Sequence, residues 1–117
     1  MAGYYQLIEG YDGGFAFILR AGNHEPIFES RVFWGRQSTL DAVVRFRRLI
    51  LDDSRLQATR NKAGQHLLHV LDDDQRLLGA GSPCASVAGL NTNRAALRRN
   101  AQAQVFRGLV RRSLVMS

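Results

Sequence analysis

The stretch GFAFILRAGNHEPIFES, residues 14–30, decides the fold, because it reads as strand, turn and strand. Phe15, Phe17 and Leu19 alternate with the residues between them at the period of two that is typical of a strand. QHLLHVLDDDQRLLGAG, residues 65–81, has the same organisation about fifty positions later. We therefore expect the chain to build one supersecondary unit twice.

A further strand precedes each hairpin, at residues 4–11 in the first unit and at 55–60 in the second. The first of these ends at a turn around Asp12–Gly14, since aspartate followed by glycine is a strong hairpin signal. The second strand of the first hairpin, IFESRVFW, is predicted as the third strand of the unit and ends at Gly35. Each unit is thus expected to contribute three strands.

A helix is predicted after each group of strands. The first should begin at Ser38, which with Asp41 three residues later matches a capping box. Asp41 and Arg45 are expected to pair one turn apart on its outer side. The second helix is expected to start near Asn91 or Thr92. The first helix has an apolar stripe at three- and four-residue spacing, made of Leu40, Val43, Val44, Phe46, Leu49 and Ile50.

One three-stranded sheet with one helix buries too little apolar surface to be stable alone, so the two units are expected to pack as a single body. A chain of 117 residues suits one compact domain. We therefore predict a single domain over 1–117, with repeat one at about 4–53, repeat two at about 54–107 and a basic tail at about 108–117.

The segment DGGFAFILRAGNHEPIFESRVF, residues 12–33, resembles the signature of the YegP-like family, also called DUF1508 or UPF0339. The family unit has Asp-Gly, an aromatic residue, Phe-x-Leu-Lys-Ala, Gly-Asn-Gly-Glu, a β-branched residue with Ile, and then Ser-Glu with an aromatic residue. The likeness covers nearly all of residues 4–100. The matching positions are Asp12, Gly13, Phe15, Phe17, Leu19, Arg20, Ala21, Gly22, Asn23, Glu25, Ile27, Ser30 and Phe33, followed in the helix by Ser38, Val43 and Phe46.

The second copy departs from the family pattern. Asp73, Asp74 and Gln75 stand where the family has Ala-Asn-Gly, and Arg94 stands where the first helix has Val43. In the first copy, His24 replaces the usual turn glycine, and a positive φ is costly for a residue with a side chain.

The resemblance implies an α+β fold of two pseudo-symmetric β-β-β-α-β repeats in tandem, which share one antiparallel sheet with the helices packed on one face. It also implies that the terminal strands exchange across that sheet, with 55–59 and 104–107 as the candidate late strands. It implies no activity, because the family has no established biochemical function.

Charge is distributed unevenly along the chain. The net charge is +6, and fifteen of the sixteen cations are arginine, with Lys62 the exception. Residues 1–74 carry nine cations and all ten acids, whereas 75–117 carry seven cations and no acid. An excess of this kind favours acidic partners such as nucleic acid, anionic lipid or an acidic protein, although a solvated arginine-rich helix face would have the same composition.

Candidate chemistry is sparse. His66 and His69 share one predicted strand, where an odd separation places them on opposite faces, so they cannot bind one metal together. Cys84 is the single cysteine, which excludes an internal disulfide and fits a reducing, cytoplasmic compartment; we expect a buried thiol there rather than a nucleophile. The acidic run 72–74 is expected to be a hairpin turn, because it lacks a calcium loop's spacing. Trp34 and its neighbour Phe33 end a strand and are expected to pack at the core or sheet edge, with exposed anchor residues as the alternative.

No catalytic constellation, phosphate loop, cofactor site or metal site is predicted, and we expect a protein that is not an enzyme. No apolar run is long enough to span a bilayer, and the N-terminus lacks the pattern of a secretory signal. No small-molecule substrate is evident.

The expected function is therefore a non-enzymatic binding module that contacts an acidic partner, such as nucleic acid or an acidic protein, through its C-terminal third. Arginine pairs with phosphate bidentately and stacks on bases, and Phe106 is interleaved among these residues. The alternative is a protein-interaction or self-associating module, for instance a homodimer, with no role in nucleic-acid binding. A third reading makes VFRGLVRRSLV, 105–115, an amphipathic helix on a membrane surface or a partner. The candidate contact residues are Arg94, Arg98, Arg99, Arg107, Arg111 and Arg112.

Overall fold

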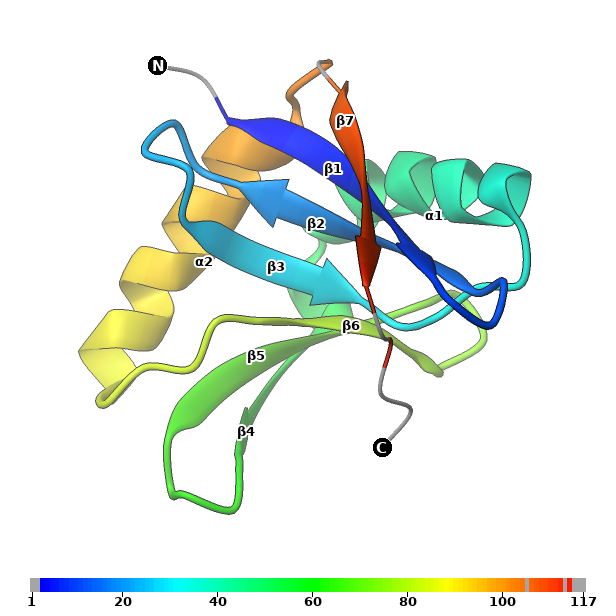
Figure 1. Ribbon diagram of the computed structural model, residues 1–117. Coiled ribbons are helices and arrows are strands. Elements are labelled where there is room, and N and C mark those ends of the chain that lie inside the picture. Colours follow the sequence, from blue (N-terminus) through cyan, green and yellow to red (C-terminus); the bar gives the residue numbers. More distant parts are fainter. Residues whose placement is uncertain (1–2, 105, 113, 115–117) are drawn as a thin grey trace.

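The computed structural model describes residues 3–104, 106–112 and 114, and the chain is α+β with one mixed sheet and two helices (Figure 1). The first half contributes β1 (Tyr4–Gly10), β2 (Phe15–Arg20), β3 (Pro26–Ser30) and α1 (Arg36–Leu49). After a short 3-10 helix, η1 (Asp53–Arg55), the second half contributes β4 (Leu56–Arg60), β5 (His66–Leu71), β6 (Leu77–Gly81) and α2 (Val87–Ala101). The last element is β7 (Phe106–Arg112).

The seven strands form one sheet in the order β4-β5-β6-β3-β2-β1-β7. β3 of the first half pairs antiparallel with β6 of the second half at the centre of this sheet. β7 follows the second helix but pairs with β1 of the first half, in agreement with the exchange of terminal strands that the family resemblance implied. This pairing is parallel, so the prediction of a purely antiparallel sheet was wrong at this one edge.

β7 corrects two further expectations about the C-terminal segment. The late strand begins and ends later than 104–107, and residues 108–112, expected as a separate tail, continue it. The prediction of an amphipathic helix over 105–115 was also wrong for Phe106–Arg112, which form a strand. Pairing with β1 instead satisfies the backbone N–H and C=O groups of this segment as a strand. A one-residue bulge, with Gly108 at a φ of 65°, adjusts the register between Phe106 and Leu109.

Both helices cover the same face of the sheet and lie behind it in Figure 1. The strands alternate as predicted, so Phe17 and Leu19 of β2 face the helices while Ala16 and Ile18 face the other side. One continuous core holds buried side chains of both halves, and the Phe28 and Phe46 rings meet in it at a centroid distance of 4.3 Å. Its members from the second half are Leu68, Val70, Leu78, Leu90, Leu97 and Ala101.

The helix starts differ from the predictions. α1 begins at Arg36 with Gly35 as its N-cap, so Ser38 lies inside the first turn and caps nothing. α2 begins at Val87, four residues before Asn91, because the Ser86 hydroxyl caps the helix by accepting from the Gly89 N–H at 3.1 Å.

Two side chains of α1 were also placed wrongly. Val44 was assigned to the apolar stripe but is 63% exposed, and Ala42 occupies the buried position instead. Arg45 does not pair with Asp41 on the outer side of the helix, since it forms an ion pair with Asp72 at 2.9 Å.

Candidate functional site

The six arginines expected to contact a partner lie on two separate elements. Arg94, Arg98 and Arg99 belong to α2, whereas Arg107, Arg111 and Arg112 belong to β7. α2 lies behind the sheet in Figure 1, whereas β7 is the edge strand of the sheet beside β1. The fold therefore does not gather all six into one patch.

Arg98 is used to join the two halves of the chain. Its Nε donates to the carbonyl oxygen of Ile50 at 2.9 Å, and its Nη2 lies 2.5 Å from a carboxylate oxygen of Asp53. The side chain is one-third exposed, at 32%. Arg98 thus connects α2 to the segment that follows α1.

Arg111 and Arg112 are also paired with acids of the first half. Arg111 lies 3.5 Å from Glu9 of β1, and Arg112 forms an ion pair with Glu29 of β3 across the helix-free face. These contacts position β7 and offset the charge of both arginines, which reduces what they offer to an external anion.

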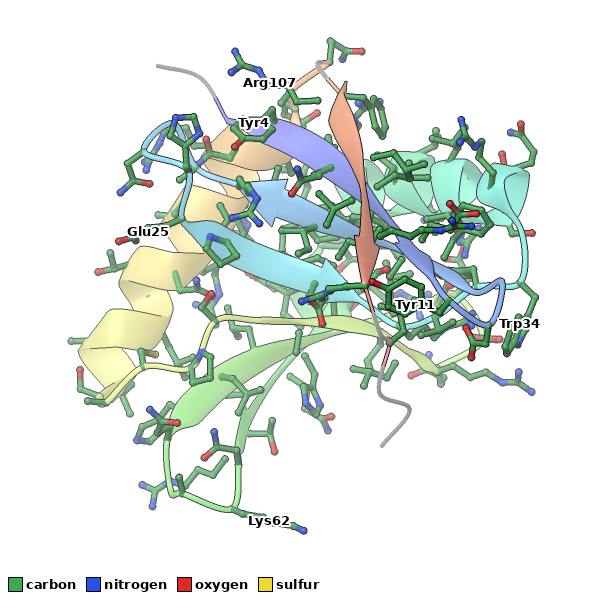
Figure 2. The ribbon with its side chains drawn as sticks, in the orientation of Figure 1. Tyr4, Tyr11, Glu25, Trp34, Lys62 and Arg107 are labelled. Carbon is green, nitrogen blue, oxygen red and sulfur yellow. The ribbon has the colours of Figure 1, made fainter. Side chains whose placement is uncertain are left out.

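The other three arginines form no ion pair with any described residue. Arg94 donates to Asn91 at 3.3 Å, and Arg99 is exposed in the last turn of α2. Arg107 is exposed and holds its guanidinium over the Tyr4 ring, 4.9 Å from the centroid. Figure 2 shows Arg107 and Tyr4 together at one end of the sheet.

Two arginines of the first half lie close to the Tyr4–Tyr5 pair, although sequence reasoning did not select them. Arg47 of α1 places its guanidinium 5.3 Å from the centroid of the Tyr5 ring and donates to the carbonyl oxygen of Ala103 at 2.7 Å. Arg20 of β2 lies directly opposite Tyr4 in the β1–β2 register. We call the resulting surface the arginine–aromatic edge; its members are Tyr4, Tyr5, Arg20, Arg47, Phe106 and Arg107.

The cations of this edge have neutral hydrogen-bond partners. Arg20 donates to the Gln6 amide oxygen at 2.9 Å and to the His24 carbonyl oxygen at 2.8 Å. The His24 ring in turn hydrogen-bonds the Tyr4 hydroxyl through Nδ1 at 2.8 Å. Because none of these partners is an acid, the positive charge of the edge is not neutralised within the described chain.

Tyr5 is the buried and rigidly held member of the arginine–aromatic edge. Its side chain is fully buried, and its hydroxyl donates to the carbonyl oxygen of Ala101 at 2.6 Å. Burial raises the pKa of Tyr5 well above its usual value, and the neighbouring Arg47 opposes this only in part. Tyr5 therefore stays neutral and acts as a packing and stacking group rather than as an acid or base.

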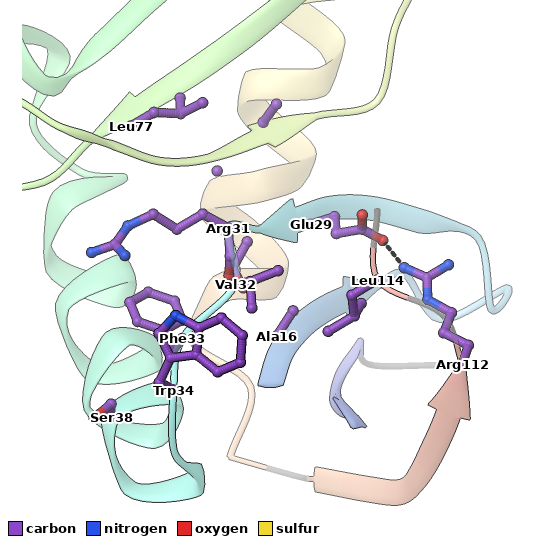
Figure 3. Close-up of a pocket in the computed structure, with 13 residues that line it drawn as sticks. Ala16, Glu29, Arg31, Val32, Phe33, Trp34, Ser38, Leu77, Arg112 and Leu114 are labelled. Atoms are coloured by element: carbon purple, nitrogen blue, oxygen red, sulfur yellow. Dashed lines mark hydrogen bonds and ion pairs between the residues drawn. The ribbon is translucent and has the colours of Figure 1, made fainter. Parts of the chain in front are cut away.

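A groove of about 840 Å³ opens on the helix-free face of the sheet (Figure 3). Its floor includes Ala16 and Ala80, and the Glu29–Arg112 ion pair crosses one side. Trp34 stands at the rim and is 66% exposed, so the expectation that it packs at the core or sheet edge was wrong, whereas its neighbour Phe33 is buried.

The groove contains ionisable groups but no arrangement typical of acid–base catalysis. The acid that lines it, Glu29, is engaged by Arg112, and Arg31 stacks its guanidinium over the Phe33 ring at 4.3 Å. Ser38 lines the groove without a histidine beside it among the lining residues. A nucleophile with an adjacent base is therefore not assembled there.

The histidines and the cysteine lie as follows. His66 and His69 point to opposite faces of β5, as predicted. Cys84 is half-buried rather than buried, and its thiol lies 3.3 Å from the His66 carbonyl oxygen. Within the described part of the chain, no three side chains of histidine, cysteine, aspartate or glutamate come together as a metal site would require.

The acidic run 72–74 forms a hairpin turn, as predicted, and its side chains are engaged by arginines. Asp72 pairs with Arg45, and Asp73 pairs with Arg48, both from α1. Asp74 pairs with Arg76 within the turn. Asp72 and Asp73 therefore fasten the turn to α1, and the three acids do not converge on a metal ion.

Comparison with known proteins was made by family models and by sequence. No protein-family model matches the chain. The UPF0339 protein YegP of Escherichia coli is 22% identical over 107 residues, which is 92% of this chain and 97% of YegP. A UPF0339 protein of Acinetobacter baylyi is 24% identical over 86 residues, covering 74% of this chain and 78% of that protein.

Solved structures agree with these relatives. The solution NMR structure of a UPF0339 protein from Shewanella oneidensis superimposes with a TM-score of 0.84 at 18% identity, covering 95% of this chain and 93% of that one. The solution NMR structure of YegP from E. coli, titled as a protein of unknown function, gives 0.83 at 21% identity, covering 97% and 95%. These relatives and structures support the resemblance to the YegP-like UPF0339 family.

Similarity to UPF0339 proteins brings no activity with it, since YegP itself is described as a protein of unknown function. None of the described helices of this protein has the length and apolar character needed to cross a bilayer. Any functional conclusion must therefore come from the side chains that the fold brings together.

Sequence reasoning missed two of the three cations of the arginine–aromatic edge. Arg20 and Arg47 lie in the half of the chain where acids balance cations, so composition gave no reason to select them. Arg107 reaches Tyr4 because β7 returns to pair with β1. The one available signal was local: Tyr4 and Tyr5 are adjacent aromatic residues at the start of the first predicted strand.

Proposed function

We propose that this protein is a non-enzymatic binding module of the cytoplasm that contacts an acidic partner through its arginine-rich C-terminal third, with nucleic acid as the favoured partner. The proposal includes all six arginines selected from the sequence, namely Arg94, Arg98, Arg99, Arg107, Arg111 and Arg112. A cytoplasmic location is favoured because the single cysteine, Cys84, allows no internal disulfide framework.

The observation that carries the proposal is the pattern of charge compensation. Residues 75–117 contain seven cations and no acid, so acids for α2 and β7 must come from elsewhere. The first half supplies three acids, which pair with Arg98, Arg111 and Arg112. Arg94, Arg99 and Arg107 remain without an acid among the described residues, and they are the cations most available to phosphate.

The first prediction concerns salt dependence. A labelled 20-nucleotide single strand should bind at low ionic strength, and its affinity should fall steeply as salt increases, because bound phosphates release counterions. The triple substitution Arg94→Gln, Arg99→Gln and Arg107→Gln should lower the slope of log K against log salt by about two, since each phosphate contact to a single strand contributes about 0.7. Fluorescence anisotropy over a salt titration measures both quantities.

The matched control removes three cations elsewhere. Arg36, Arg60 and Lys62 are exposed and form no ion pair with described residues, so their replacement by glutamine lowers the net charge equally. This variant should keep most of the wild-type slope. Absence of binding by the wild-type protein at low salt would refute the proposal, and equal losses in the two variants would refute the choice of residues.

The second candidate is a self-associating or protein-interaction module, and the observation that favours it is the open outer edge of β7. Every residue of this strand is exposed, and the unpaired backbone of an edge strand can add a strand from another molecule. Light scattering of the full chain distinguishes the candidates. A concentration-dependent mass would favour self-association, but deletion of 104–117 is a poor test because it would uncover β1.

We also propose that the two halves, 4–53 and 54–107, are worn tandem copies of one pseudo-symmetric β-β-β-α-β unit. Positions 51 residues apart adopt the same unusual backbone: Gly13 and Gly64 have φ values of 91° and 79°, and His24 and Gln75 have 72° and 68°. Positive φ is unfavourable for residues with a side chain, such as His24 and Gln75, and both halves adopt it at the equivalent turn. The repeated order of three strands and a helix supports the same reading.

A further inference from the structure

The Phe106 ring is placed as a platform for stacking. It lies on the Tyr5 ring with a centroid distance of 5.5 Å and an interplanar angle of 26°, yet Phe106 is 42% exposed. Tyr5 is fully buried and is held by its hydroxyl bond to Ala101. The platform is therefore rigid on one side and open to solvent on the other, which is the geometry that stacks a planar group at low entropic cost.

Guanidinium groups flank this platform on both faces of the sheet edge. Arg47 lies over Tyr5, the ring on which Phe106 stacks, and Arg107 follows Phe106 in the chain and lies over Tyr4 on the opposite face. The Arg47 Nε is buried and has no hydrogen-bond partner among the described residues. Two arginines without acids beside an open aromatic ring match the chemistry of a nucleotide unit, which has anionic phosphates on either side of a flat base.

We infer that the arginine–aromatic edge binds single-stranded nucleic acid, with one base stacked on the open face of Phe106 and the flanking phosphates against Arg47 and Arg107. This inference rests on the proposed function and deepens it by naming the class of partner and the place of contact. An acidic polypeptide would satisfy the arginines equally well, but it would leave the face of Phe106 without a planar partner. The aromatic platform is what favours a nucleic acid.

The first test uses the wild-type protein and changes only the ligand. A 20-nucleotide thymidine strand is compared with a strand of the same length and charge that lacks its bases, and with poly-glutamate of equal charge. The thymidine strand should bind roughly 5- to 140-fold more tightly than the abasic strand, as expected for the loss of one to three kcal/mol of stacking. Equal affinity for the thymidine and abasic strands, or for poly-glutamate, would overturn the inference.

The second test changes the protein. Phe106→Leu should weaken binding of the thymidine strand by a similar factor while leaving the salt slope unchanged, whereas Phe106→Tyr should bind as the wild type does. The matched control is Leu109→Ala, because Leu109 lies on the same strand and is 47% exposed but has no ring. Circular dichroism and thermal unfolding report whether each variant is folded.

The outcomes separate the inference from the proposed function. If the wild-type protein binds no strand at low salt, the proposed function fails and the inference fails with it. If salt-dependent binding occurs but Phe106→Leu and the abasic strand change nothing, charge alone explains the binding and only the inference is overturned. A loss of affinity in Leu109→Ala equal to that in Phe106→Leu would also overturn it, because strand packing would then account for the effect.

Discussion

The Asp72 carboxylate is buried yet ionised, because α1 presents an arginine to it. Arg45 donates through Nε to Oδ1 at 3.0 Å and through Nη2 to Oδ2 at 2.9 Å. Burial by itself would raise the pKa of Asp72, but the bonds from Arg45 and from the Asp73 N–H outweigh burial and hold the pKa below its ordinary value. The pair therefore contributes to folding only while Asp72 is charged.

At the residue scale, we predict that Asp72→Asn lowers the free energy of unfolding by about 1–3 kcal/mol near neutral pH. The loss should be smaller than for a fully buried pair, because the Arg45 side chain is 32% exposed and retains some contact with water. Asp74→Asn is the matched control in the same turn. Asp74 is 57% exposed and pairs with Arg76, so its loss should be close to zero, as measured by urea unfolding.

The pH dependence of this difference has a definite sign. A carboxyl with a lowered native pKa stabilises the fold fully above its unfolded pKa of about 3.9 and loses that contribution as the pH falls through the native value. The wild type and Asp72→Asn should therefore differ by a constant amount at mildly acidic and neutral pH and converge below about pH 4. A difference that grew on acidification would contradict this assignment of the Arg45–Asp72 pair.

At the element scale, the two helices begin in different ways. The Ser86 hydroxyl satisfies the Gly89 N–H of α2, whereas α1 starts after Gly35 and has no side-chain cap. Ser86→Ala should therefore lower the free energy of unfolding by about 1 kcal/mol. Ser38→Ala should have little effect, although the sequence pattern points to Ser38 as the cap. Thermal or urea unfolding of both variants measures this difference. Equal losses of unfolding free energy would contradict the assignment of Ser86, and not Ser38, as a helix cap.

The elements themselves could be predicted from local pattern, but their limits could not. Alternating apolar residues such as Phe15, Phe17 and Leu19 located β2, because period two is a property of the strand itself. The capping pattern at Ser38 failed because the Thr39 N–H and hydroxyl both bond the Gly35 carbonyl oxygen, which places the helix start three residues earlier. The parallel pairing of β7 depends on a partner about a hundred residues away, which no local window contains.

At the scale of the whole molecule, the candidate site could be predicted only in part. The acid-free block after Asp74 is visible in the sequence and indicated the arginines of α2 and β7. The sequence does not show which of these arginines have their charge neutralised, because that depends on acids that the fold places beside them, such as Glu9 beside Arg111. Arg47 joins the site through the packing of α1 against β1, so a non-local contact decides its role.

The continuous core predicts that neither half is stable alone. Phe28 of β3 lies opposite Gly81 of β6, and Arg98 of α2 bonds the Ile50 carbonyl oxygen after α1. Separate chains 1–53 and 54–117 would each expose their half of this interior, and chains of about 60 residues have little buried surface to spare. We expect each fragment alone to lack cooperative thermal unfolding and dispersed NMR amide signals, and the mixed fragments to recover both.

A control separates the loss of the interior from the loss of the chain connection. A Gly-Ser insertion between Leu51 and Asp52, which are both exposed and precede η1, should leave the full chain folded, because lengthening a surface loop costs only a fraction of a kcal/mol. Cooperative unfolding of the isolated 1–53 fragment would instead mean that the first half has a sufficient core of its own. β7 would then be an addition to a finished domain, and the arginine–aromatic edge, which needs β1 and β7 together, would be a surface between two independent units.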